Sequence, residues 1–169
     1  IDYGENKVQE ALEKWTEIKE TNSEIKLHMI GKLQTNKVKF AVKLFDYIHS
    51  VDSEKLAKKI ADEQNKINKN IKIFLQVNIG DENQKSGINK NELNQLVSYC
   101  KEINLDLIGL MCIPPVNTNP DVYFDEMQNL NKTLGFEELS MGMSSDFLVA
   151  AKHKSTFIRV GSSIFGQRS

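Results

Sequence analysis

The chain has 169 residues, of which 40% are hydrophobic and 27% are charged, and its net charge is −1. This length suits one domain with a substantial core, and the composition is ordinary for a soluble globular protein. The nearly balanced charge gives no global field that would attract nucleic acid or an anionic membrane. No apolar run approaches the roughly 20 residues of a membrane helix, and no signal peptide is visible. We therefore expect a cytoplasmic protein that binds neither nucleic acid nor membrane.

Helical and strand-like spacings of apolar residues alternate along the whole chain. The segment 71–79 is the clearest strand, because it is rich in branched residues. We expect one helix cap at Asp52 or Ser53 and another at Ser144 or Ser145. Strands are predicted at 1–6 (a fragment), 25–30, 47–51, 71–79, 105–113, 138–143 and 156–160, and helices at 8–18, 38–45, 54–67, 93–100, 124–134 and 147–152.

This regular alternation predicts a parallel sheet, because parallel strands need helical crossovers. No glycine-rich dinucleotide fingerprint follows an early strand, so a Rossmann fold is disfavoured. A (β/α)₈ barrel typically has roughly 250 residues. This chain is shorter, and its first residues read like the end of a strand. We expect an α/β fold, a (β/α)₈ TIM barrel that is incomplete at the N-terminus, with its first strand missing.

Two small-residue turns follow the last two predicted strands. They contain Met143, Ser144 and Ser145 in the first turn, and Gly161 and Ser162 in the second. Barrel sites lie at the carboxyl ends of the strands, and phosphate is often held after strands seven and eight. Glycine lets an anion approach the backbone, and N–H groups at a helix N-terminus favour negative charge. Either turn alone is usually structural, but together they predict a phosphate site.

A single arginine lies beside the second turn. Arg159 precedes Gly161 by two residues and therefore points to the same face of its strand. Burying an arginine without a partner is costly. Two interpretations stay open: a salt bridge to Glu5, Asp146 or another core carboxylate, or a contact to a ligand beside the phosphate.

The cysteines and histidines do not form a recognisable pattern. Cys100 occupies an apolar position of a predicted helix, and Cys112 lies in a predicted strand, so we expect two buried, inert thiols. His28, His49 and His153 lack the spacing of metal ligands, and no metal is expected.

Seven segments follow one another in the order of a known protein family. They are 4–10, 28–39, 48–53, 85–87, 109–114, 139–147 and 155–166. Together they resemble the pyridoxal phosphate homeostasis protein family, whose barrel is similar to the N-terminal domain of alanine racemase. The resemblance runs from one end of the chain to the other. It implies a single barrel domain over residues 1–169 that binds pyridoxal 5′-phosphate (PLP).

The resemblance implies cofactor-binding roles for seven residues. They are Asn6, Met143, Ser144, Ser145, Arg159, Gly161 and Ser162. By the family pattern the phosphate is held by one or both serines of the first turn with the glycine and serine of the second. Arg159 faces the pyridine nitrogen, Asn6 lies near the ring, and Met143 packs near the cofactor. An arginine there stays cationic, so it disfavours protonation of the ring nitrogen and makes the ring a poor electron sink.

The function implied is that of a non-catalytic PLP-binding protein of intracellular PLP (vitamin B6) homeostasis and amino-acid balance. We expect a monomer whose partner is PLP itself. One alternative is a PLP-dependent amino-acid racemase-like enzyme, which needs positioned acid and base groups that the sequence does not offer. Another is a barrel that binds a different phosphorylated metabolite.

The sequence departs from the family pattern at two places. The family's Schiff-base lysine lies on the first strand, upstream of the motif that begins at Gly4, and nothing like it precedes Gly4 in this sequence. We therefore expect the covalent anchor to be absent and phosphate or sulfate to be able to occupy the site. Lys154 stands where the family pattern has glycine.

Overall fold

The structure is a computed structural model that describes residues 1–82 and 86–166. Its strands are β1 (Asp2–Glu5), β2 (Lys26–Met29), β3 (Tyr47–Val51), β4 (Lys72–Val77), β5 (Asp106–Cys112), β6 (Glu138–Met143) and β7 (Phe157–Arg159). Its α-helices are α1 (Val8–Thr21), α2 (Val38–Leu44), α3 (Glu54–Lys66), α4 (Leu93–Glu102), α5 (Pro120–Thr133), α6 (Phe147–Lys152) and α7 (Ser162–Phe165). Two short 3₁₀ helices are η1 (Thr35–Lys37) and η2 (Lys90–Glu92).

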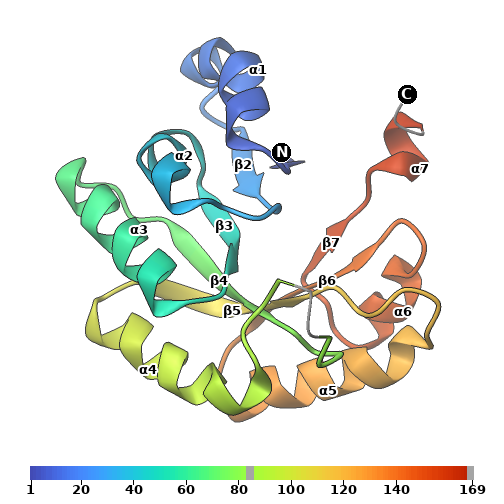
Figure 1. Ribbon diagram of the computed structural model, residues 1–169. Helices are drawn as coiled ribbons and strands as arrows, with labels where there is room; N and C mark the ends of the chain where they lie inside the picture. Colours follow the sequence, from blue (N-terminus) through green and yellow to red (C-terminus); the bar gives the residue numbers. More distant parts are fainter. Residues whose placement is uncertain (83–85, 167–169) are drawn as a thin grey trace.

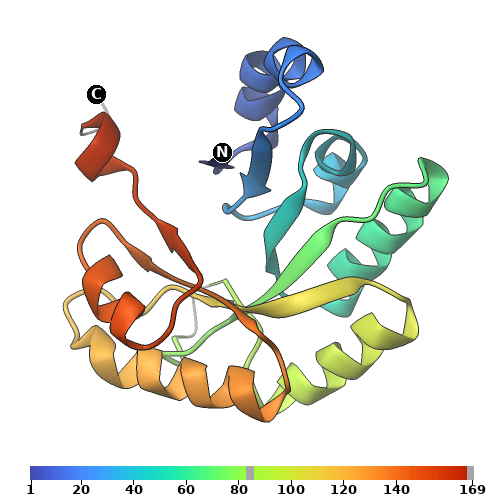
Figure 2. The ribbon, with the colours of Figure 1, turned by 180° about the vertical axis from the view of Figure 1, so that it is seen from behind.

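The seven strands form one sheet whose spatial order is the chain order, from β1 to β7. Every neighbouring pair is parallel. The sheet curves into a nearly closed barrel with the larger helices on its outer side, and β1 and β7 are the two edge strands (Figures 1 and 2). The expected parallel barrel of βα steps is therefore confirmed. All carboxyl ends of the strands share one end of the barrel, which is where the predicted site residues lie.

The sheet separates two interiors, as β4 shows. In β4, Ile73, Leu75 and Val77 belong to the apolar core between the sheet and the helices. Because side chains alternate along a strand, Phe74 and Gln76 point to the opposite face, toward the barrel interior. The interior face is the one that carries polar side chains.

One of the two helix caps predicted from the sequence is present, and the other is not. Ser53 caps α3, because its hydroxyl accepts a 3.4 Å hydrogen bond from the Leu56 backbone N–H. A cap of α6 by Ser144 or Ser145 is wrong. Asp146 is the N-cap residue of α6, and its carboxylate accepts a 2.6 Å hydrogen bond from the backbone N–H at position 143. The turn over 144–146 thus leaves both serines outside the helix.

Both cysteines are buried and free, as expected. Burial is the main cause that raises the pKa of Cys100 to about 11 and that of Cys112 to about 12. Among the described residues, no helix is long and apolar enough to cross a membrane. The same part of the chain holds no cluster of three or more histidines, cysteines or carboxylates arranged around a metal ion.

Lys154, which stands where the family pattern has glycine, has an unusual backbone conformation. It lies in the turn between α6 and β7 with a φ of 61°, in the left-handed region. Residues other than glycine enter that region at a steric cost, which explains why a glycine suits this position.

Candidate functional site

The turns after β6 and β7 meet at one point. The backbone N–H of Gly161 donates a 3.2 Å hydrogen bond to the hydroxyl of Ser144. A methyl group built on Gly161 would find no atom within 4 Å, so the space beside its Cα is open. We call Ser144, Ser145, Gly161 and Ser162 the phosphate cradle. Its two turns come together as the sequence predicts.

The other cradle residues and Met143 lie at the surface around this contact. Ser145 and Ser162 are exposed, and Ser162 is the first residue of the short helix α7. Met143 ends β6, is 39% exposed, and lies opposite Arg159 in the register of β6 and β7. Six of the seven predicted residues therefore belong to one pair of neighbouring strands and the turns that follow them.

The seventh residue comes from the opposite edge of the sheet. Asn6 follows β1 directly and is exposed, at the same end of the barrel as the cradle. Its backbone packs tightly against Gly31, where a methyl group would lie only 2.2 Å from the Asn6 carbonyl oxygen. Within residues 1–82 and 86–166, no hydrogen bond joins Asn6 to the cradle. Proximity of Asn6 to a bound ligand stays a prediction.

Arg159 is bound by neutral groups in the described part of the chain. Its Nη1 donates a 2.8 Å hydrogen bond to the hydroxyl of Ser140, and its Nη2 donates one of 2.8 Å to the backbone carbonyl of Cys112. Burial lowers the pKa of Arg159, although a guanidinium stays charged near neutral pH. The arrangement differs from a direct salt bridge to a core carboxylate.

The two carboxylates considered for that salt bridge have other partners. Glu5 accepts a 2.7 Å hydrogen bond from the indole of Trp15 and a 3.0 Å bond from the ammonium of Lys14. Asp146 accepts from the backbone N–H at the end of β6. The cationic face of Arg159 is therefore not neutralised by direct contact with either of them.

Behind Arg159 lies a polar chain, buried except at its Asp2 end, that the sequence did not reveal. The hydroxyl of Ser140 lies 2.8 Å from Nδ1 of His49, and Nε2 of His49 lies 2.9 Å from Nδ1 of His28. Nε2 of His28 lies 2.9 Å from a carboxylate oxygen of Asp2. We call these five residues the interior relay. It connects β7, β6, β3, β2 and β1 through the inside of the barrel.

Aromatic rings enclose the two histidines of the relay. Tyr47 stacks on His28 with ring centres 4.2 Å apart and 9° between the planes. Phe74 stacks on His49 at 4.3 Å and 18°. Phe157 meets both Phe74 and His49 edge-on, at 5.3 and 5.7 Å. These contacts fix the planes of both imidazoles and keep water away from them.

Burial makes both imidazoles weak bases. Burial is the main cause that holds the pKa of His49 well below its usual range, and the positive charge of Arg159 acts in the same direction. Desolvation also lowers the pKa of His28, with the carboxylate of Asp2 acting in the opposite direction. Both rings are therefore neutral at pH 7.

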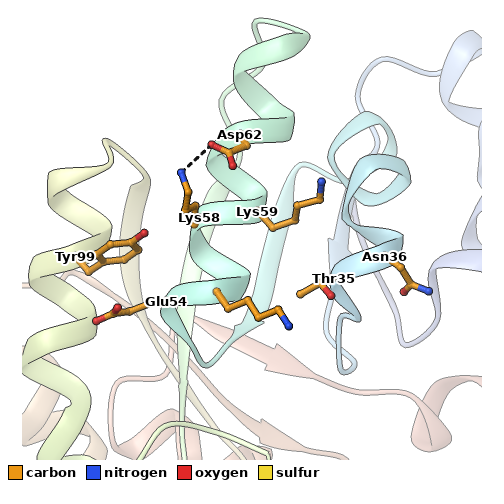
Figure 3. Close-up of a pocket in the computed structure, with 8 residues that line it drawn as sticks. Thr35, Asn36, Glu54, Lys58, Lys59, Asp62 and Tyr99 are labelled. Atoms are coloured by element: carbon orange, nitrogen blue, oxygen red, sulfur yellow. Dashed lines mark hydrogen bonds and ion pairs between the residues drawn. The ribbon is translucent and has the colours of Figure 1, made fainter.

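A separate hollow of about 570 Å³ lies on the outer helical layer (Figure 3). Its walls come from η1, α3 and α4, and its lining residues are Thr35, Asn36, Glu54, Lys55, Lys58, Lys59, Asp62 and Tyr99. Lys58 pairs with Asp62 at 3.4 Å and Lys59 pairs with Glu63 at 2.7 Å. Since these ammonium groups already face carboxylates, the hollow offers a mixed-charge surface that is distinct from the cradle.

Comparison with known proteins places the chain in a family. The family model described as "Alanine racemase, N-terminal domain" matches residues 2–169. The pyridoxal phosphate homeostasis protein of Aquifex aeolicus (strain VF5) is 40% identical over 176 residues, which cover 98% of this chain and 76% of that protein.

Two solved structures of PipY from Synechococcus elongatus PCC7942 share the fold. The structure without PLP superposes with a TM-score of 0.86 at 35% identity, covering 96% of this chain and 80% of that one. The structure with PLP bound gives a TM-score of 0.82 at 34% identity, with the same coverage. Family match, identity and fold agree with the resemblance found in the sequence. The chain belongs to the pyridoxal phosphate homeostasis protein family and has the barrel of the alanine racemase N-terminal domain.

Proposed function

We propose that this chain is a non-catalytic PLP-binding protein that acts in intracellular PLP homeostasis and amino-acid balance. The names of the relatives and the PLP-bound structure of PipY support this proposal. In it, residues 1–169 form one PLP-binding domain that works as a cytoplasmic monomer. Its partner is the small molecule PLP, and nucleic acid has no role.

The observation that carries the proposal is the contact between Ser144 and Gly161. The Gly161 N–H donates to the Ser144 hydroxyl and so holds the two neighbouring strand ends together, with open space beside the Gly161 Cα. A phosphate needs several convergent hydrogen-bond donors and close access to backbone. In the proposal the Ser144 hydroxyl, which accepts from Gly161, donates its own hydrogen to the phosphate. In the proposal Ser145 and Ser162, both exposed on the adjoining turns, complete the set of donors.

Arg159 fits the pyridine end of the same ligand. Two of its five N–H groups are used inside the barrel, and within the described residues the remaining three donate to no other group. In the proposal one of these three donates to the ring nitrogen. When bound, PLP supplies a ring that can withdraw electrons from attached groups. A permanent cation beside the ring nitrogen disfavours its protonation and weakens that property. In the proposal Met143 and Asn6 flank the ring.

The same cradle also accommodates inorganic phosphate or sulfate. The proposed phosphate contacts are hydrogen bonds from hydroxyl and backbone groups, and none of them needs a covalent link to the ligand. We therefore propose that the 169-residue chain holds PLP through its phosphate and its ring nitrogen, and that inorganic phosphate competes for the same place.

Calorimetric titration of the full chain with PLP, pyridoxal and inorganic phosphate tests the proposal. We expect PLP to bind at least about tenfold more tightly than pyridoxal, because removal of the phosphate removes charge-assisted hydrogen bonds. Ser144→Ala weakens PLP binding, whereas Ser98→Ala, an exposed serine on α4, is the matched control and leaves it unchanged. Equal affinity for PLP and pyridoxal would contradict the proposal.

Chiral chromatography separates the proposal from the racemase alternative. Saturating PLP and single enantiomers of free amino acids are incubated with the chain, and we expect no interconversion above that with PLP alone. Turnover that disappears in Arg159→Ala would establish an enzyme instead. Binding of inorganic phosphate without binding of PLP would favour a different phosphorylated metabolite.

A further inference from the structure

The two ends of the interior relay determine the direction in which its hydrogen bonds are donated. Arg159 has only hydrogen-bond donors, and the ionised carboxylate of Asp2 has only acceptors. Four links join them, at 2.8, 2.8, 2.9 and 2.9 Å. Each link needs one hydrogen, and the four donors that can supply them are one each from Arg159, Ser140, His49 and His28.

Working back from Asp2 fixes each proton. His28 must donate from Nε2 to the carboxylate, so in its neutral form its Nδ1 is an acceptor. His49 must then donate from Nε2 to that nitrogen, and its own Nδ1 accepts from the hydroxyl of Ser140. The oxygen of Ser140 is left to accept from Nη1 of Arg159. Every hydrogen is used once, and no two donors face each other.

An added proton on either ring would break this pattern. If His49 carried hydrogen on both nitrogens, the hydroxyl hydrogen of Ser140 would lose its acceptor. If His28 carried hydrogen on both nitrogens, it would donate from Nδ1 to His49, whose own hydrogen would then have to lie on Nδ1. The hydroxyl hydrogen of Ser140 would again lose its acceptor. The orphaned hydroxyl would lie beside the guanidinium, in a site where Ser140 has no exposed surface. Neutral rings are thus required by geometry as well as favoured by burial.

We propose that Ser140, His49 and His28 are positioning residues for Arg159, joined as a one-directional relay in which both imidazoles are neutral Nε2–H tautomers. The O–H and N–H dipoles of the relay all turn their negative ends toward the guanidinium, and aligned hydrogen bonds strengthen one another. Arg159 is therefore held without an adjacent carboxylate that would cancel its charge. The consequence for the ring nitrogen of a ligand rests on the proposed function.

Tautomers can be read directly in the ligand-free chain. Protein labelled with ¹⁵N-histidine is studied at pH 7 by long-range proton–nitrogen correlation, which tells a protonated ring nitrogen from a bare one. We expect His28 and His49 each to show hydrogen on Nε2 and none on Nδ1. His153, which lies outside the relay and contacts Asp121, assigns the third set of signals through His153→Gln. Hydrogen on Nδ1 of either relay histidine overturns the proposal, whether or not PLP binds.

Coupling to the ligand is measured with a pair of probes. PLP and its 1-deaza analogue, which has C–H in place of the ring nitrogen, differ only in the acceptor proposed for Arg159. In the unmodified chain the deaza analogue should have the larger dissociation constant, because it lacks the acceptor for Arg159. Ser140→Ala lets the guanidinium move, so the dissociation constant of the analogue divided by that of PLP should fall about tenfold. His49→Phe keeps a ring stacked on Phe74 and should act in the same direction. The affinity for inorganic phosphate should change less than about twofold.

The outcomes separate positioning from general damage. If PLP and the deaza analogue weaken equally in Ser140→Ala, the residue only supports the fold and the positioning role is overturned. If the unmodified chain does not bind PLP at all, the proposed function fails, and the tautomers in the free chain still decide the relay. Ser98→Ala is the control and should leave the ratio of the dissociation constants unchanged.

Discussion

The backbone N–H of Gly161 and the hydroxyl of Ser144 are joined by a hydrogen bond of 3.2 Å across 17 residues of sequence. This bond ties the turn after β7 to the turn after β6. Gly161 itself has an ordinary φ of −119°, so its backbone does not require glycine. The absence of a side chain at Gly161 therefore matters only for the access of a ligand such as an anion.

Gly161→Ala should therefore separate stability from binding. The new methyl group would contact nothing within 4 Å and needs no backbone change, so the free energy of unfolding should stay within about 0.5 kcal/mol of its original value. The same methyl group fills the open space beside the Cα of Gly161, and the affinity for inorganic phosphate should fall about tenfold or more. Thermal unfolding and calorimetry measure the two effects. Unaltered phosphate binding would show that the anion does not approach Gly161.

Gly142→Ala is the contrasting substitution on the same pair of strands. Gly142 has a φ of 94°, and a methyl group there would lie 2.6 Å from Cβ of Ala150 and 3.0 Å from Cα of Phe147. Backbone strain and overpacking together should lower the free energy of unfolding by about 2 kcal/mol or more. Urea denaturation of both glycine variants side by side tests whether the two positions differ as described.

Lys154→Gly should stabilise the protein. The left-handed backbone at Lys154, with a φ of 61°, costs a residue with a Cβ roughly 1–2 kcal/mol, and the gain from glycine is partly offset by a more flexible unfolded chain. We expect a net gain of about 0.5–1 kcal/mol by urea denaturation. Lys152→Gly, at the last residue of α6 and outside the left-handed region, is the matched control and should bring no gain in stability. A loss of stability in both variants would contradict the strain at Lys154.

Stability should fall on mild acidification. Burial lowers the pKa of His28 and that of His49 below 6.5, so the unfolded chain binds more protons than the folded one as the pH falls through that value. The free energy of unfolding should decrease from about pH 7.5 to about pH 5.5, by up to about 1.4 kcal/mol per pH unit for each histidine. The charged groups around the two rings are Asp2, Asp46, Lys19 and Arg159.

His49→Phe should make that pH dependence shallower, because one of the two groups is removed. Burial opposes ionisation of Asp46, but the Lys19 ammonium and the Leu27 N–H lower the pKa of this carboxyl below 3.8, so its own contribution is lost only at lower pH. Urea denaturation at several pH values measures the slope. A flat profile between about pH 7.5 and about pH 5.5 in the unmodified protein would contradict neutral, buried histidines.

The two thiols should resist modification in the folded protein. Cys100 and Cys112 have no exposed surface, and their pKa values are raised to about 11 and about 12. Since the thiolate is the reactive form, a disulfide reagent such as Ellman's should label less than one thiol per chain within minutes at about pH 8. Unfolding in urea should expose both thiols to rapid labelling. Fast labelling without denaturant would show that this part of the core opens.

Much of the fold could be predicted because its signals are local. Each strand and each long helix has its own periodicity, and the cradle was visible because glycine and serine follow two strands in succession. The inward direction of Arg159 follows from alternation along β7. Its partners could not be predicted, because they depend on which residues of distant strands reach the same depth in the barrel.

The relay shows this limit most clearly. His28 and His49 become neighbours through the register of β2 and β3, in which His28 lies opposite Tyr47. His49 meets Ser140 only because the sheet curves enough to bring β3 and β6 together across the interior. Neither the register nor the curvature can be predicted from the spacing of residues along the sequence. The cap of α6 was missed for a smaller reason, since three candidate residues follow one another and the chain uses the last.

The chain order of the strands has a consequence for how the molecule folds. Each strand pairs with the strand that precedes it, so the sheet can grow by closing one short loop after another, at a modest entropic cost each time. The hydrogen bond between His49 and Ser140 is different, since it spans 91 residues. It can form only after β4, β5 and β6 have joined in sequence. Its appearance during refolding would thus report that the part of the sheet from β3 to β6 has reached its native curvature.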